Sequence, residues 1–136
     1  EAFGALYPES LQDTSSNEQR AWLCAKPNES YWGCTTHLSA GGNTTTLNQC
    51  KYLMSTVVPA LWSSEGQLPS IVGGDLNLRY GGPPNVQDCV PSGWYRKGDG
   101  SVQHITVTSN LTFDSSKKIG MQYTDHPGWK VTAITP

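Results

Sequence analysis

The chain has 136 residues, enough for one modest domain with a real core. Its net charge of −2 gives no general attraction to nucleic acid or anionic membranes, so a polyanion would have to bind a local patch. The sequence has no run of about 18 apolar residues, so it predicts no membrane-spanning helix. Charged residues make up only 15% of the chain, which favours a loop-rich, β-containing secreted domain.

The cysteines match neither a Cys-x-x-Cys motif nor a zinc-type spacing. They are Cys24, Cys34, Cys50 and Cys89. An even number in such a composition favours two disulfides and an oxidising, extracellular compartment, with free buried thiols as the alternative. Because Cys24 and Cys34 flank an expected hairpin turn, 24–34 with 50–89 is the preferred pairing among the three possible.

Residues 1–18 are polar and aperiodic, which predicts a surface segment or a severed connection ahead of one domain over residues 19–136. Strands are predicted over 19–25 and 31–37, with a turn between them. A helix is predicted to begin near Asn43 or Thr45, both suitable N-caps, and to end or kink at Pro59. Its apolar stripe is Leu47, Cys50, Leu53 or Met54, Val57 and Leu61.

A short buried strand is predicted at Ile71-Val72, between Pro69 and Gly73-Gly74. The order strand, helix, strand predicts a crossover unit packed on a sheet. Residues 79–100 are predicted to form a long loop, and residues 102–110 and 129–134 two further strands. These elements together predict an α+β fold.

Three short polar stretches lie at the ends of predicted strands. They contain His37, Asp75 with Asn77, and Asp125 with His126. Because residues two apart in an extended chain point the same way, Asp75 and Asn77 are expected to project together while Leu76 turns into the core. Imidazoles can move protons and carboxylates can orient a base or hold a metal, so these groups suit hydrolysis of a phosphate ester. For His104, inside a predicted strand, a structural role is favoured.

The ordered set His37-Leu38-Ser39, Gly74-Asp75-Leu76-Asn77 and Thr124-Asp125-His126 resembles the endonuclease/exonuclease/phosphatase superfamily. The resemblance covers roughly residues 19–135. It implies the C-terminal half of that fold: a β-sheet with a flanking helix, half of a four-layer α/β/β/α sandwich. It also implies that His126 is the general base on water and that Asp75 orients it. Asn77 would contact the scissile phosphate, and His37 a phosphate oxygen or the leaving group.

The same resemblance implies a Mg²⁺ cofactor, with Mn²⁺ or Ca²⁺ as alternatives. Asp75 and Asp125 would lie at the metal, while its principal ligands belong to an N-terminal half that is missing here. Arg20 matches a position where some nucleases of the family touch the phosphate backbone. Gln103 stands where the family usually has an Asp, which weakens the case for a second metal site.

One face of the predicted sheet should pack against the missing sheet, because an apolar face of that size does not stay bare in water. Either an N-terminal half of the same enzyme covers it, or two copies pair sheet to sheet, or the fold is reduced. The leading function is a secreted Mg²⁺-dependent phosphodiesterase, nuclease or phosphatase, with nucleic acid among its candidate substrates. The alternative is a non-catalytic binding or assembly module. The five tryptophans suggest a carbohydrate-binding domain as a minor third reading.

Overall fold

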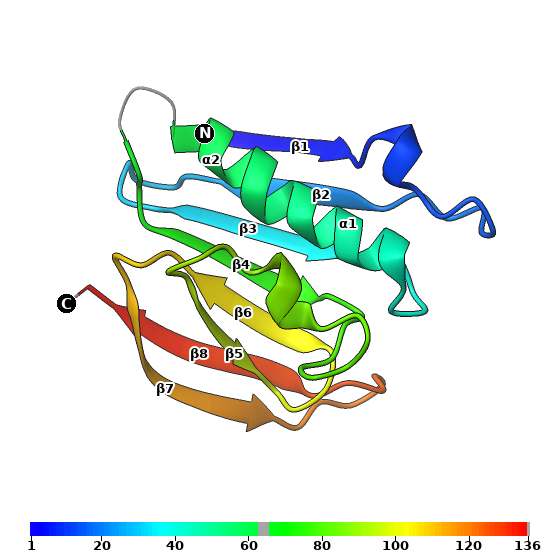
Figure 1. The fold of residues 1–136 in the computed structure, drawn as a ribbon. Helices are drawn as coiled ribbons and strands as arrows, with labels where there is room; N and C mark the ends of the chain where they lie inside the picture. The colour runs from blue at the N-terminus through cyan, green and yellow to red at the C-terminus, as the bar shows by residue number, and fades with distance from the viewer. Residues whose placement is uncertain (63–65, 136) are drawn as a thin grey trace.

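The described residues, 1–62 and 66–135 of a computed structural model, form two β-sheets and one helical layer (Figure 1). Six strands make the larger sheet, in the spatial order β1-β2-β3-β4-β6-β5. Their bounds are β1 Ala2–Leu6, β2 Ala21–Ala25, β3 Trp32–His37, β4 Ser70–Asp75, β5 Tyr95–Gly98 and β6 Gln103–Val107. Strands β7 (Thr112–Ile119) and β8 (Gly128–Ile134) form the second sheet. The α+β fold expected from the sequence is confirmed.

The predicted crossover unit is present, because β3 and β4 are parallel neighbours joined through the helical layer. That layer runs from Thr44 to Trp62 and lies across one face of the sheet (Figure 1). It begins with a capping box, in which the Asn43 side chain accepts from the Thr46 backbone and the Thr46 hydroxyl accepts from the Asn43 backbone. The helix therefore starts at one of the two N-caps predicted from the sequence.

Of the two outcomes expected at Pro59, an end or a kink of the helix, the end is wrong, because the chain stays helical beyond it. α1 (Thr44–Tyr52) is followed by a π-helical turn, η2 (Leu53–Val57), and by α2 (Val58–Trp62). Within this turn the Val58 N–H donates to the Leu53 carbonyl, five residues earlier. The hydrogen-bond pattern has therefore already changed from four to five residues just before Pro59. The N–H that Pro59 lacks does not interrupt a regular α-helical pattern there, and the chain stays helical.

Three strands were not predicted from the sequence. β1 belongs to the first 18 residues, β5 and the 3₁₀ turn η4 (Val86–Cys89) lie in the predicted long loop, and β7 was not foreseen. Every residue of β1 is exposed, and β7 carries the polar run Ser115–Lys118. These strands are formed by pairing with neighbours, and their sequences lack the alternation that marks a half-buried strand.

The core lies between the helical layer and the sheet. Trp32 and Val72 from the strands pack there with Leu53 and Met54 from the helix, all at most 1% exposed. The predicted disulfides are confirmed: Cys24–Cys34 joins β2 to β3, and Cys50–Cys89 joins α1 to η4. Disulfides of this kind are typical of proteins from oxidising compartments. None of the described helices is long and apolar enough to cross a membrane.

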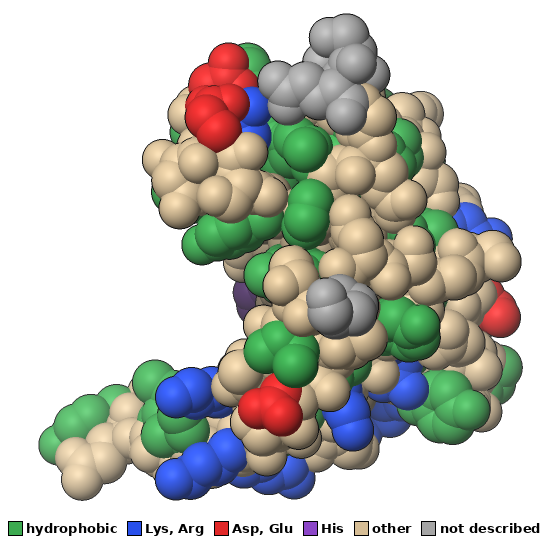
Figure 2. Space-filling model, turned by 90° about the vertical axis from the view of Figure 1, so that its left-hand side faces the viewer, with side chains coloured by type: hydrophobic (Ala, Val, Ile, Leu, Met, Phe, Trp, Pro, Cys, Tyr) green, Lys and Arg blue, Asp and Glu red, His purple; other side chains and the backbone are tan. Residues whose placement is uncertain are grey.

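The opposite face of the six-stranded sheet, called here the open face, carries no helical layer. It is hollowed at the left of Figure 2, above a projecting arm that bears Lys side chains and corresponds to β7–β8. Leu6 and Leu23 are about half exposed on this face, at 53% and 51%. A cavity of about 520 Å³ there is lined by apolar side chains that include Ile71, Ile105 and Val131.

Candidate functional site

Parallel pairing of β3 and β4 places His37 beside Asp75. The two residues are the last register pair of these strands, so their side chains leave the sheet on the same face. The His37 Nε2 atom lies 3.5 Å from Asp75 Oδ2. The sequence motifs around His37 and Asp75 are 38 residues apart along the chain, and the crossover brings them together.

His126 reaches the same carboxylate from the loop between β7 and β8. Its Nε2 atom also lies 3.5 Å from Asp75 Oδ2. The Asp75 side chain is only 11% exposed, whereas His37 and His126 are 59% and 37% exposed. One nearly buried carboxylate therefore sits between two accessible imidazoles, each of which forms an ion pair with it when protonated. We call His37, Asp75 and His126 the His–Asp–His cluster.

Asp75 and Asn77 are held by a turn rather than by an extended strand. Asn77 has a positive φ of 50°, and its backbone N–H donates to Asp75 Oδ1 at 2.9 Å. The Asn77 side-chain amide donates to the Leu38 carbonyl at 2.8 Å, which ties this turn to the end of β3. The strand alternation that was expected to carry on to Asn77 therefore stops at Asp75, although Leu76 is buried as expected.

Gly74 is required by the close approach of β3 and β4 directly below the cluster. Its φ is 156°, and a Cβ atom on this residue would lie 2.0 Å from the Thr36 carbonyl oxygen. No other residue fits there without moving one of the two strands. The glycine before Asp75 thus allows the pairing that brings His37 and Asp75 together.

Three other candidate residues differ in where they lie. Asp125 is next to the cluster, with Oδ2 3.8 Å from His126 Nε2, but its side chain is 91% exposed. Gln103 is the register partner of Asp75 on β6. Arg20 precedes β2, and its guanidinium pairs with Glu18. Among the described residues no contact joins Arg20 to the cluster.

His104 has a structural role. It is 1% exposed, its Nε2 lies 2.8 Å from the Leu78 carbonyl, and its Nδ1 lies 3.1 Å from Arg96 Nη1. These partners assign the proton to Nε2, which donates to Leu78, while Nδ1 accepts from Arg96. Burial, assisted by the charge of Arg96, lowers the pKa of His104 and keeps the ring neutral. His104 thereby anchors the chain one residue after Asn77.

Arg79 was missed by the sequence analysis. With Asn77 it lines a cavity of about 330 Å³, together with Gly41 and Gly42 from the loop after β3. The Arg79 side chain is exposed, and no described residue forms a hydrogen bond or ion pair with its guanidinium. The only sequence signal for Arg79 is its place two residues after Asn77, which is too common a spacing to single out a residue.

The side chains at the cluster do not form a Mg²⁺ site by themselves. Mg²⁺ prefers oxygen ligands in octahedral geometry. The cluster offers one carboxylate, and Asp75 Oδ1 already accepts from the Asn77 backbone. Within residues 1–62 and 66–135, no group of three His, Cys, Asp or Glu side chains could hold a metal ion. The assignment of Asp75 and Asp125 as metal ligands therefore stays a prediction.

Comparison with known proteins identifies the fold. No protein-family model matches the sequence, and no curated protein matches it. Among solved structures, an endonuclease/exonuclease/phosphatase from Bacteroides vulgatus aligns with 100% of this chain at 12% identity and a TM-score of 0.72. A mannosyl-6-phosphatase of Bacteroides thetaiotaomicron aligns with 98% of it at 14% identity and 0.70. D. rerio TDP2 in complex with single-strand DNA product aligns with 99% at 19% identity and 0.67.

These alignments leave part of each solved structure unmatched. The chain covers 65% of the B. vulgatus protein, 66% of the mannosyl-6-phosphatase and 67% of TDP2. At such low identities the likeness concerns the fold and not the activity. The resemblance drawn from the three motifs is thus confirmed for the fold: the chain has the architecture of the endonuclease/exonuclease/phosphatase proteins, over about two thirds of their length.

Proposed function

We propose that this chain carries the proton-transfer residues of a phosphate-ester hydrolase. The observation behind the proposal is that Asp75 Oδ2 lies 3.5 Å from Nε2 of both His37 and His126. Two accessible imidazoles that share one carboxylate can supply both a base and an acid: the neutral ring accepts a proton and the protonated ring donates one. The fold, which phosphatases and nucleases also have, supports this reaction class.

The reaction can be written with these side chains alone. Neutral His126 takes a proton from a water molecule, whose oxygen forms a bond to phosphorus. The bond from phosphorus to the leaving oxygen breaks, and protonated His37 donates a proton to that oxygen. Asp75 then stabilises the imidazolium of His126, since the two groups lie at ion-pair distance. A final proton exchange with solvent returns both histidines to their starting states.

Substrate contacts are proposed for Asn77 and Arg79. Asn77 follows the cluster directly, and Arg79 lines the adjoining cavity with a guanidinium that no described side chain engages. A guanidinium can bind a phosphate oxygen with two hydrogen bonds. We assign the substrate as a phosphate ester, with nucleic acid among the candidates. For Arg20 we propose a contact to the phosphate backbone of a long polyanion only, because its guanidinium pairs with Glu18 and no described contact joins it to the cluster.

We propose Mg²⁺, with Mn²⁺ or Ca²⁺ as alternatives, as a cofactor whose principal ligands come from a further segment. Asp75 and Asp125 would be this chain's contribution to that site. The same segment would cover the open face, where apolar side chains line a cavity of about 520 Å³. An N-terminal half of the same protein is the preferred cover, and a second copy packed sheet to sheet is the alternative. The two disulfides support a secreted protein.

A non-catalytic binding or assembly module is the second candidate. Gln103, a neutral side chain, lies directly across from Asp75, and the cluster alone lacks the oxygen ligands of a metal site. A module of this kind would keep the fold and bind a phosphate-bearing partner without hydrolysing it. It would not respond to divalent cations in a turnover assay.

Turnover of bis(p-nitrophenyl) phosphate and p-nitrophenyl phosphate, with and without Mg²⁺, tests the proposal. We expect His126→Ala to lower kcat by about 10²–10⁴, since a general base contributes about that much. The matched control is Tyr123→Ala in the same loop, where Tyr123 is fully exposed; it should leave kcat unchanged. Equal effects of the two substitutions would contradict the role of His126. The assay uses the protein together with the N-terminal segment proposed to supply the metal ligands, and absence of hydrolysis by that wild-type protein would support the binding module instead.

A further inference from the structure

Strand β1 is an open edge of the six-stranded sheet. Glu1 and Lys26 exchange two backbone hydrogen bonds, and the Tyr7 N–H donates to the Arg20 carbonyl. Because antiparallel pairs alternate between bonded and non-bonded residues, odd-numbered residues of this strand direct their backbone groups toward β2. Ala2, Gly4 and Leu6 therefore direct their N–H and C=O groups away from the sheet. No loop or turn hydrogen bond of the described residues reaches them.

Apart from its length of five residues, strand β1 itself lacks the features that usually prevent an edge from pairing with another strand. Natural edge strands are protected by charged residues, proline, bulges or a covering segment. The sequence Ala-Phe-Gly-Ala-Leu has no charge and no proline, and its register with β2 has no bulge. Every residue of β1 is exposed, with Phe3 at 50% and Leu6 at 53%. The net charge of −2 adds little repulsion between two copies.

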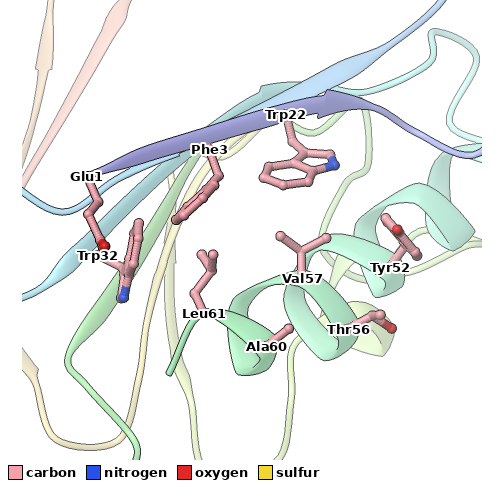
Figure 3. Close-up of a pocket in the computed structure, with 9 residues that line it drawn as sticks. All are labelled: Glu1, Phe3, Trp22, Trp32, Tyr52, Thr56, Val57, Ala60 and Leu61. Atoms are coloured by element: carbon pink, nitrogen blue, oxygen red, sulfur yellow. The ribbon is translucent and has the colours of Figure 1, made fainter. Parts of the chain in front are cut away.

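Neighbouring side chains hold β1 in place before any partner arrives. Phe3 projects from the strand toward the helix, beside Trp32, with ring centroids 6.0 Å apart. Figure 3 shows Phe3 and Trp22 on one wall of a cavity of about 570 Å³ and Val57 and Leu61 of the helix on the other. The strand is thus positioned by packing on one side while its outer edge stays unpaired, which lowers the ordering cost of adding a strand.

We propose that two copies of this chain pair β1 to β1, antiparallel, about a two-fold axis at Gly4. In this register Ala2 lies opposite Leu6 of the second copy, and Gly4 lies opposite Gly4. The three pairs with outward-facing backbone groups form about six hydrogen bonds, two for each pair. A continuous sheet of both copies results, and the interface is isologous, as two-fold symmetry requires.

The side chains of β1 are self-complementary in this register. On the open face the large Leu6 lies opposite the small Ala2 of the second copy. On the helix face the large Phe3 lies opposite the small Ala5. Glycine sits at the axis, where two identical residues meet. This large-over-small pattern on both faces is the reason to assign a second copy, and not an unrelated strand, as the partner.

Edge pairing is separate from the proposed catalysis and from cover of the open face. The His–Asp–His cluster lies at the ends of β3 and β4, with β2 between it and the edge. A dimer through β1 therefore leaves the cluster accessible. It also leaves the open face free to pack against a further segment.

Sedimentation velocity over a concentration series tests this dimer. The wild-type chain should sediment as a species of about twice its 14.8 kDa mass. Ala2→Lys/Leu6→Lys places like charges opposite each other twice across the axis. We expect it to raise the dissociation constant of the dimer at least about tenfold. Ala2→Glu/Leu6→Lys places opposite charges there and should restore the dimer. Because both positions are exposed, the two variants should fold alike.

Thr35→Lys is the control for pairing through the open face, since Thr35 is exposed on β3 and remote from the edge. It should leave the dimer intact. The proposal is overturned by a wild-type monomer at all concentrations, by a dimer that persists in Ala2→Lys/Leu6→Lys, or by a dimer lost only in Thr35→Lys. The last result would show sheet-to-sheet pairing instead.

Discussion

The disulfide Cys50–Cys89 should contribute more to stability than Cys24–Cys34, because it closes a longer loop. The sequence separations are 39 and 10 residues. In the chain-entropy treatment, a cross-link removes about 2.1 + 1.5R ln n cal/mol/K from the unfolded chain. This gives about 3.9 kcal/mol at 25 °C for Cys50–Cys89 and about 2.7 kcal/mol for Cys24–Cys34. The longer link also fastens η4, at the end of the loop that carries Arg79, to the helix.

Urea unfolding of Cys50→Ala/Cys89→Ala and Cys24→Ala/Cys34→Ala measures this difference. Alanine is the replacement of choice because all four side chains are at most 6% exposed, and serine would bury a hydroxyl. The free energy of unfolding should fall in both variants, and by about 1 kcal/mol more in the first. An equal loss, or a larger loss in Cys24→Ala/Cys34→Ala, would refute the loop-entropy reasoning. The slopes with urea show whether the unfolded states remain comparable.

Two further predictions concern His104 and Gly74. The lowered pKa of His104 means that the unfolded chain takes up a proton first as the pH falls below about 6.5, so unfolding free energy should decrease there. His104→Gln should lose this part of the pH dependence in urea midpoints between pH 5 and 7.5; an unchanged profile would contradict it. Gly74→Ala should lower the free energy of unfolding by more than about 3 kcal/mol, because the added methyl group clashes with Thr36. Gly120→Ala meets open space and should lower it by less than about 0.5 kcal/mol. Similar melting temperatures for the two variants would contradict the clash.

Local patterns in the sequence were enough to predict the helix, the disulfides and the crossover unit. The apolar stripe of the helix is a period that one segment displays by itself, and Asn43 caps it through its own neighbours. Strands β1, β5 and β7 could not be predicted in this way. Their sequences are polar, short or uniformly exposed, and they are strands because of the partners beside them.

The sequence predicted which residues make up the candidate site better than it predicted how they are arranged. The motifs identify His37, Asp75 and His126, but the sharing of one carboxylate by two imidazoles depends on the register of β3 with β4 and on the β7–β8 loop. The left-handed turn at Asn77 was missed because strand alternation was assumed to continue past Asp75. Arg79 was missed because a lone arginine carries no pattern, and only the folded loops place it beside Asn77.

Nuclear magnetic resonance of the histidine side chains during titration with inorganic phosphate tests the shared site most directly. The chain has three histidines, so each resonance can be assigned by a single substitution. A phosphate site at the His–Asp–His cluster predicts that the ring signals of His37 and His126 shift together, with one midpoint, while those of the buried His104 stay fixed. Unchanged His37 and His126 signals, or two unrelated midpoints, would contradict a single phosphate-binding centre at Asp75.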